Sequence, residues 1–100
     1  MKPEKKIKAW VFRVGKNPVY EGIGTELKSM QKIVGGYIES MKIGEGLMAI
    51  VNEEGKIKGL PLNVSAKIVG PEGGIFPLYG DFFICGIKHG RLINAPKNLF

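Results

Sequence analysis

Cysteine, histidine and arginine are scarce in this chain. Cys85 is the only cysteine and His89 the only histidine, which excludes an intramolecular disulfide and the usual Cys-rich or His-rich metal cages. On an extended segment these two side chains would lie about 13 Å apart, too far for a nucleophile and its base. A carboxylate-only site for Mg²⁺ or Ca²⁺ is left open. We predict no catalytic residue, no resident metal and no cofactor, and a lone thiol fits a reducing cytosol.

Long apolar runs are also missing. The most apolar window, residues 75–87, is interrupted by Pro77, Gly80 and Asp81, whereas a membrane helix needs about 18 or more apolar residues. No apolar run follows the basic N-terminal residues, as a signal peptide would require. We therefore expect a soluble, cytoplasmic protein with no membrane partner.

Arginine supplies little of the positive charge. The chain has two arginines, Arg13 and Arg91, and thirteen lysines, and its formal net charge is +6. Such a field attracts anionic partners without selecting their class, because bidentate recognition of phosphates and bases falls mainly to arginine. Lys8, Trp10 and Phe12, together with Arg13, offer a faint version of a nucleic-acid surface, and burial of both aromatic rings in the core is the alternative.

The size of the chain indicates one domain. With 100 residues, 44% of them hydrophobic and 24% charged, the sequence is that of a globular protein with a single thin core. We predict one domain over residues 1–100 and, because a thin core gains stability from association, a homodimer or larger homo-oligomer.

One helix is predicted over about residues 25–34. Thr25 is a suitable N-cap, apolar residues recur at i, i+3, i+6 and i+7, and Gly35 and Gly36 end the pattern.

The remaining segments favour strands. A turn over residues 15–18 joins residues 7–14 to residues 19–20 as a hairpin, and further extended segments are predicted at residues 37–43, 47–53, 64–69 and 81–88, with strand-like alternation at 56–58. The fold class is α+β, a mainly antiparallel sheet of five to six strands packed by one main helix. The tail, residues 91–100, shows little periodicity and is expected to be loosely held.

Several motifs occur in a fixed order between residues 30 and 86. These are VGGYIE, NEEGK, LPLN and a GD pair before an apolar strand, and together they resemble a family of small phage and bacterial proteins known as domain of unknown function 3846. The family-like core covers about residues 25–90. The resemblance implies a phage or mobile-element origin and a bacterial host cytoplasm, and it brings no established reaction.

Polar residues within these motifs are the candidate ligand-binding site. They are Gln31, Tyr37, Glu39, Asn52, Glu53, Lys56, Lys58 and Asn63. If they converge, the tyrosine could stack on a base, the amides and Glu39 could read hydrogen-bonding edges, and the lysines could neutralise phosphate. The alternative is that NEEG is a hairpin turn, LPLN a loop and the lysines a solubilising edge.

These residues lead to three functional hypotheses, none of them an enzyme. The first is a phage anti-defence protein that sequesters a small anionic, nucleotide-derived signalling molecule without changing it. The second is a protein that binds and inhibits a host defence enzyme through an apolar surface. The third, less favoured, is a nucleic-acid-binding protein, which would require the lysines on one continuous face.

Overall fold

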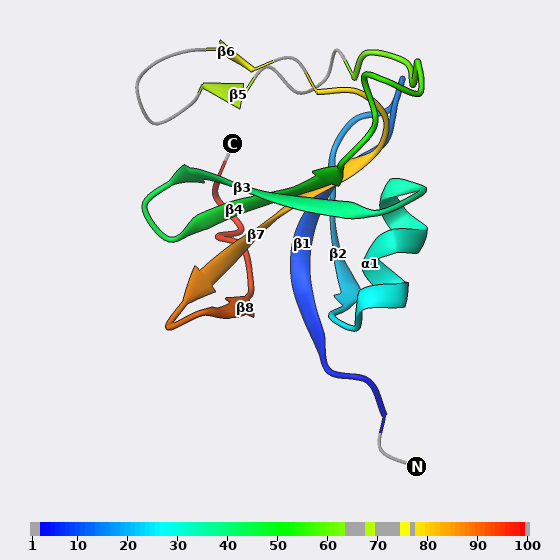
Figure 1. The fold of residues 1–100 in the computed structure, drawn as a ribbon. Helices are drawn as coiled ribbons and strands as arrows, with labels where there is room; N and C mark the ends of the chain where they lie inside the picture. Colours follow the sequence, from blue (N-terminus) through cyan, green and yellow to red (C-terminus); the bar gives the residue numbers. More distant parts are fainter. Residues whose placement is uncertain (1–2, 64–67, 70–74, 77, 100) are drawn as a thin grey trace.

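The computed structural model describes residues 3–63, 68–69, 75–76 and 78–99. The described residues form one helix and eight strands (Figure 1). The elements are β1 (Lys6–Phe12), β2 (Val19–Gly24), α1 (Leu27–Val34), β3 (Ile38–Gly44), β4 (Leu47–Asn52), β5 (Ile68–Val69), β6 (Ile75–Phe76), β7 (Phe82–Lys88) and β8 (Arg91–Ile93).

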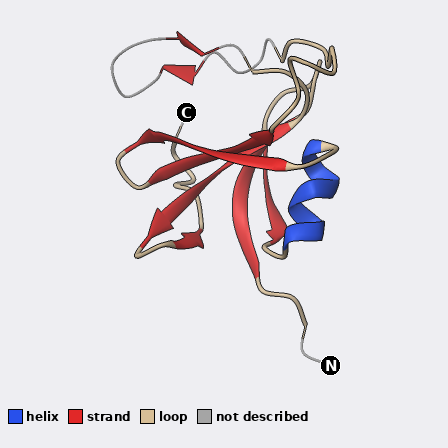
Figure 2. Cartoon of the chain, viewed as in Figure 1, coloured by secondary structure: helices blue, strands red, loops and turns tan. Residues whose placement is uncertain are grey.

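Six strands make one antiparallel sheet. Its order is β2-β1-β7-β4-β3, with β8 also paired to β7, while β5 and β6 pair with each other. The helix lies beside this sheet (Figure 2). The predicted α+β class, one helix with a mainly antiparallel sheet of five to six strands, is confirmed.

The helix starts differently from the prediction. Its N-cap is Glu26, which makes no cap with its own side chain, and the Thr25 hydroxyl instead donates to the carbonyl of Lys5. The amide of Glu26 donates to the carboxylate of Glu4 at 2.8 Å. An acceptor at the start of the helix therefore comes from a residue distant in sequence, while the Thr25 side chain bonds outside the helix.

The helix ends as predicted. Gly35 has φ 79°, and its amide donates to the carbonyl of Gln31 at 2.8 Å. This left-handed cap needs glycine because a Cβ is disfavoured there. Strand β3 begins three residues after this cap, at Ile38.

Apolar residues cover both faces of the sheet, because alternate residues of a strand point to opposite faces. On the face toward α1, Met30 and Val34 belong to the same buried cluster as Val11 and Phe83. On the opposite face, which we call the far face, Phe12 stacks on Phe82 with ring centroids 4.8 Å apart. Burial on both faces explains the continuous apolar run of β7.

The segment after β7 is anchored rather than loosely held. β8 pairs with β7, the amide of Ala95 donates to the carbonyl of Lys8, and Ala95 is buried. Trp10 Nε1 donates to the carbonyl of Pro96 at 2.9 Å, and the Tyr20 hydroxyl donates to that of Ala95 at 2.7 Å. The sequence of this segment shows no periodicity because the segment is held beside β1 largely by backbone groups, which every residue carries.

Residues 53–59 form consecutive turns instead of the strand-like segment suggested by the alternation at 56–58. The amide of Lys58 donates to the carbonyl of Glu54, and that of Leu60 donates to the carbonyl of Gly55. Local hydrogen bonds thus satisfy the backbone without a partner strand. Of the extended segment predicted at 64–69, residues 64–67 lie outside the described residues.

Candidate functional site

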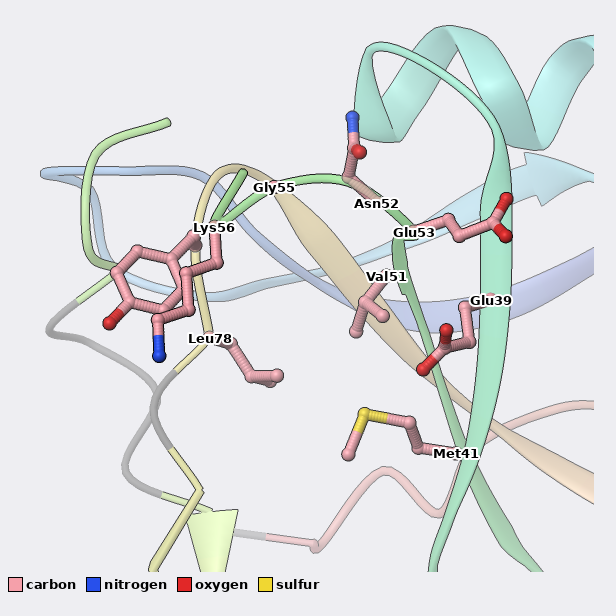
Figure 3. Close-up of a pocket in the computed structure, with 9 residues that line it drawn as sticks. Glu39, Met41, Val51, Asn52, Glu53, Gly55, Lys56 and Leu78 are labelled. Atoms are coloured by element: carbon pink, nitrogen blue, oxygen red, sulfur yellow. The ribbon is translucent and has the colours of Figure 1, made fainter. Parts of the chain in front are cut away.

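A pocket of about 310 Å³ opens on the far face at the β3 side of the sheet. Strands β3 and β4 form one side, the turn after β4 forms another, and Leu78 and Tyr79 before β7 line a third (Figure 3). We call it the β4 pocket. Its lining residues are Glu39, Met41, Val51, Asn52, Glu53, Gly55, Lys56, Leu78 and Tyr79.

Four of the eight predicted site residues line this pocket: Glu39, Asn52, Glu53 and Lys56. Glu39 projects from the edge strand β3, where it pairs with Val51 of β4. The other three follow one another at the end of β4 and in the turn. The sheet therefore brings together residues from two separate motifs, VGGYIE and NEEGK.

Asn52 shapes the turn that carries its neighbours. Its Oδ1 accepts the amide of Glu54 at 2.8 Å, its Nδ2 donates to the carbonyl of Val34 at 3.1 Å, and only 7% of the residue is exposed. The amide side chain thus both starts the turn and satisfies a carbonyl at the end of α1. Both polar groups of its side chain are therefore engaged by the backbone, one of them in the turn that carries Glu53 and Lys56.

Gly55 allows two walls of the pocket to approach closely. A Cβ at this position would lie 2.8 Å from the carbonyl oxygen of Tyr79 and 3.3 Å from its Cβ. Any larger residue would push the turn away from the segment before β7. The glycine of NEEGK was the available signal for this contact, and it was missed because only polar residues were predicted to form the site.

The pocket floor is apolar. Val51 and Leu78 are 6% and 7% exposed, and Met41 packs against the same buried cluster. These residues were missed because they carry no polar group, although ligand pockets are mostly lined by apolar side chains. Their signal was position: Met41 lies two residues beyond Glu39, on the same face of the strand.

The charged groups occupy different sides of the floor. Glu39 and Lys56 lie on opposite sides, with Met41 and Leu78 between them, and the carboxylate of Glu53 is turned away from Lys56 (Figure 3). The lining therefore presents two carboxylates on the strand side and one ammonium on the turn side. Such an arrangement suits a ligand with hydrogen-bond donors at one end and an anionic group at the other.

The other four predicted residues lie outside the pocket lining. Gln31 is half-buried on α1, and Tyr37 and Lys58 are exposed. Asn63 is 1% exposed, and its Nδ2 donates to the carbonyls of Phe12 and Gly80 at 2.9 and 3.1 Å. Its buried amide holds the end of the LPLN segment against β1.

The thiol and the histidine lie away from the pocket. Cys85 is fully buried in β7, and burial raises its pKa to about 11, while His89 is exposed in the turn before β8. Across residues 3–63, 68–69, 75–76 and 78–99, no cluster of three or more His, Cys, Asp or Glu side chains could hold a metal ion.

Comparison with known proteins identifies the family. The family model for Domain of unknown function (DUF3846) matches residues 7–99, so the chain belongs to this family, and the resemblance carried by VGGYIE, NEEGK and LPLN is confirmed. No curated protein and no solved structure matches the chain. In the part of the chain that the structure describes, no helix is long and apolar enough to cross a membrane.

Proposed function

We propose that this member of the DUF3846 family is a binding protein that holds a small nucleotide-like molecule in the β4 pocket and leaves it chemically unchanged. The observation that supports this most directly is the meeting of Glu39, Glu53 and Lys56, from two sequence motifs, around an apolar floor. A volume of about 310 Å³ is at the small end of ligand pockets, which favours one nucleoside unit over a dinucleotide.

The chemistry of the lining suggests how the ligand lies. The carboxylate of Glu39 would accept hydrogen bonds from amino or hydroxyl groups, while the base or ribose covers Met41 and Leu78. Lys56 would contact the phosphate. Charge-assisted contacts at both ends would set the direction of the ligand, and the floor would exclude water from one side of it.

The biological setting that we propose is the one implied by the resemblance of the sequence to small phage and bacterial proteins. We propose that the chain removes a signalling nucleotide of a bacterial defence system within the host cytoplasm. Sequestration suits this role because each captured molecule is withdrawn by mass action without any reaction. A homo-oligomer would raise the number of sites per particle.

A depletion assay tests the proposal. Purified protein is incubated with a panel of mononucleotides and cyclic or ADP-ribose-derived nucleotides, free ligand is measured, and the mixture is heated and analysed by mass spectrometry. Depletion followed by release of the intact nucleotide supports sequestration. A new mass would indicate catalysis, and failure to deplete any nucleotide would refute the proposal.

Two variants locate the site. Lys56→Gln should weaken binding about tenfold or more, because a charge-assisted contact to phosphate is lost, and Lys58→Gln is the matched control, exposed in the same turn but outside the pocket lining. In the same way, Glu39→Gln is compared with a control variant, Glu45→Gln, in the turn between β3 and β4. Equal losses from each variant and its control would place the ligand elsewhere.

A further inference from the structure

The two edges of the main sheet are protected to different degrees. The edge strand β3 carries exposed Glu39 and Lys42 and has a register irregularity between Lys42 and Gly44. Charges and bulges of this kind discourage the addition of another strand. The opposite edge strand, β2, contains no lysine or proline, and its one charged residue, Glu21, is paired with Arg13 at 2.6 Å (Figure 1).

The backbone of β2 offers hydrogen-bonding groups outward. Lys8 uses its amide and carbonyl on the side away from β2, where they meet the Asn94 side chain and the Ala95 amide. Gly22 pairs directly with Lys8 in the antiparallel register, so its own amide and carbonyl point away from β1. The alternation of the ladder gives Tyr20 the same outward direction.

The far face beside Gly22 is hollow and basic. A cavity of about 400 Å³ is lined by Lys6, Ile7, Lys8, Gly22 and Asn94, with no acidic residue among them. A Cβ at Gly22 would meet no atom within 4 Å. A strand added to β2 would lie about 10 Å from β1, and with no side chain in between, a glutamate on it could reach Lys8.

At the neighbouring pair of the ladder, a carboxylate of the chain itself already lies over the glycine. Gly24 pairs with Lys6, and the carboxylate of Glu4 fills the place that a Cβ of Gly24 would take. This carboxylate accepts hydrogen bonds from the Ser29 hydroxyl and the Glu26 amide, and Lys6 makes a smaller contribution to lowering its pKa. At Gly22, the other glycine on this face of β2, the corresponding space beside Lys8 holds no side chain.

The other face of β2 offers a different surface. A cavity of about 420 Å³ lies between β2 and α1, and its lining combines Ile23 and Ile33 with the polar residues Arg13, Glu21, Ser29, Lys32 and Asp81. Aliphatic side chains on this face of an added strand would find Ile23 and Ile33 there, beside charged groups of both signs. A period-2 peptide with acids on one face and aliphatic residues on the other fits both surfaces.

We propose that the free edge of β2 binds an extended, acidic peptide segment of another protein as an additional strand, with carboxylates over Gly22 near Lys8 and aliphatic side chains near Ile23 and Ile33. The β2 strand of a second copy fits the edge poorly, since its one acidic residue, Glu21, is already paired with Arg13. This surface is separate from the β4 pocket.

The test uses the full chain and a capped heptapeptide of alternating glutamate and valine. The expected result is a shift of the Tyr20 and Gly22 amide signals in NMR titrations, with affinity falling as salt rises. Gly22→Pro removes the outward amide and should weaken binding about tenfold, while leaving the pairing with β1 intact. Ser40→Pro is the matched control, because Ser40 holds the outward-pointing position on β3, and it should change affinity by less than about twofold.

A second variant keeps the test valid if Gly22→Pro does not fold. Lys8→Gln replaces an exposed side chain and should weaken binding about threefold, the range of a surface ion pair. Peptide-induced shifts centred on β3, equal binding of a lysine–valine peptide, or equal losses in Gly22→Pro and Ser40→Pro would overturn the proposal.

Discussion

Replacing Asn63 by alanine should lower the free energy of unfolding by about 3 kcal/mol, because its buried amide joins two parts of the fold. Its Nδ2 donates to the carbonyls of Phe12, at the end of β1, and Gly80, just before β7. Its backbone amide donates to the carbonyl of Leu78 at 2.8 Å, and this bond survives the substitution. The variant therefore removes only the side-chain contacts.

The magnitude follows from the burial of those contacts. Asn63 is 1% exposed, so water cannot easily replace the lost donors, and each buried hydrogen bond costs about 1.5 kcal/mol to remove. Two of them give about 3 kcal/mol, which lowers the melting temperature of a domain of this size by about 15 °C. Asn63→Asp should be worse still, since a carboxylate cannot donate to either carbonyl.

Thermal and urea unfolding followed by circular dichroism measures this loss. Asn98→Ala is the control, since Asn98 is exposed and its replacement should change stability by less than about 0.5 kcal/mol. A loss below about 1 kcal/mol for Asn63→Ala would refute the structural role. Unchanged stability together with lost nucleotide binding would restore the ligand-reading role predicted from the sequence.

Three further predictions follow from other parts of the structure. Hydrogen bonds from Ser29 and from the backbone amide of Glu26 hold the pKa of Glu4 below its ordinary value of 4.5. Its stabilising effect is therefore present above that value and lost as the pH falls through the lowered pKa, so Glu4→Gln should reduce the melting temperature at pH 7 and converge with the parent chain in acid. The thiol of Cys85, buried and with its pKa raised to about 11, should react with iodoacetamide at pH 8 only after unfolding. Gly55→Ala should cost about 1–3 kcal/mol in urea unfolding and weaken nucleotide binding, because its Cβ would meet the carbonyl of Tyr79.

Each of these has a clear contrary result. A pH-independent difference between Glu4→Gln and the parent chain would show that the ionised carboxylate does not stabilise α1. Rapid alkylation of folded protein would contradict the burial of Cys85. For Gly55→Ala the comparison is Gly22→Ala, whose Cβ would meet no atom within 4 Å, and equal costs would argue against the close contact with Tyr79.

The periodic elements were predictable because their signals are local. The helix was predicted at 25–34 and found at Leu27–Val34, and the apolar run at 81–88 became β7. The start of the helix was predicted wrongly because the acceptor at its first turn comes from Glu4, more than twenty residues away. The backbone contacts that anchor Ala95 have no sequence pattern, since they use groups that every residue carries.

The candidate site was predictable only in part, for a similar reason. Side chains on adjoining strands, such as Glu39 and those at the end of β4, come together whenever the two strands pair in register. Whether an amide faces ligand or backbone depends on tertiary contacts, and Asn63 is buried against the main chain. The sequence motifs therefore indicated candidate residues, but they did not distinguish a residue that lines the pocket from one that holds the fold together.

The charge distribution of the β4 pocket restricts the ligand further than the net charge of the chain does. A net charge of +6 attracts anions from a distance. Within the pocket, however, the single positive charge of Lys56 is outnumbered by the carboxylates of Glu39 and Glu53. An anionic group placed near the strands would be repelled, so the proposed ligand must carry its phosphate at one end and its donor-rich edge at the other. A nucleotide that carries phosphates at both of its ends would bind less well than a mononucleotide with the same base, despite its greater charge. Competition between two such ligands at low salt separates local recognition from long-range attraction, because long-range attraction alone would favour the more highly charged molecule.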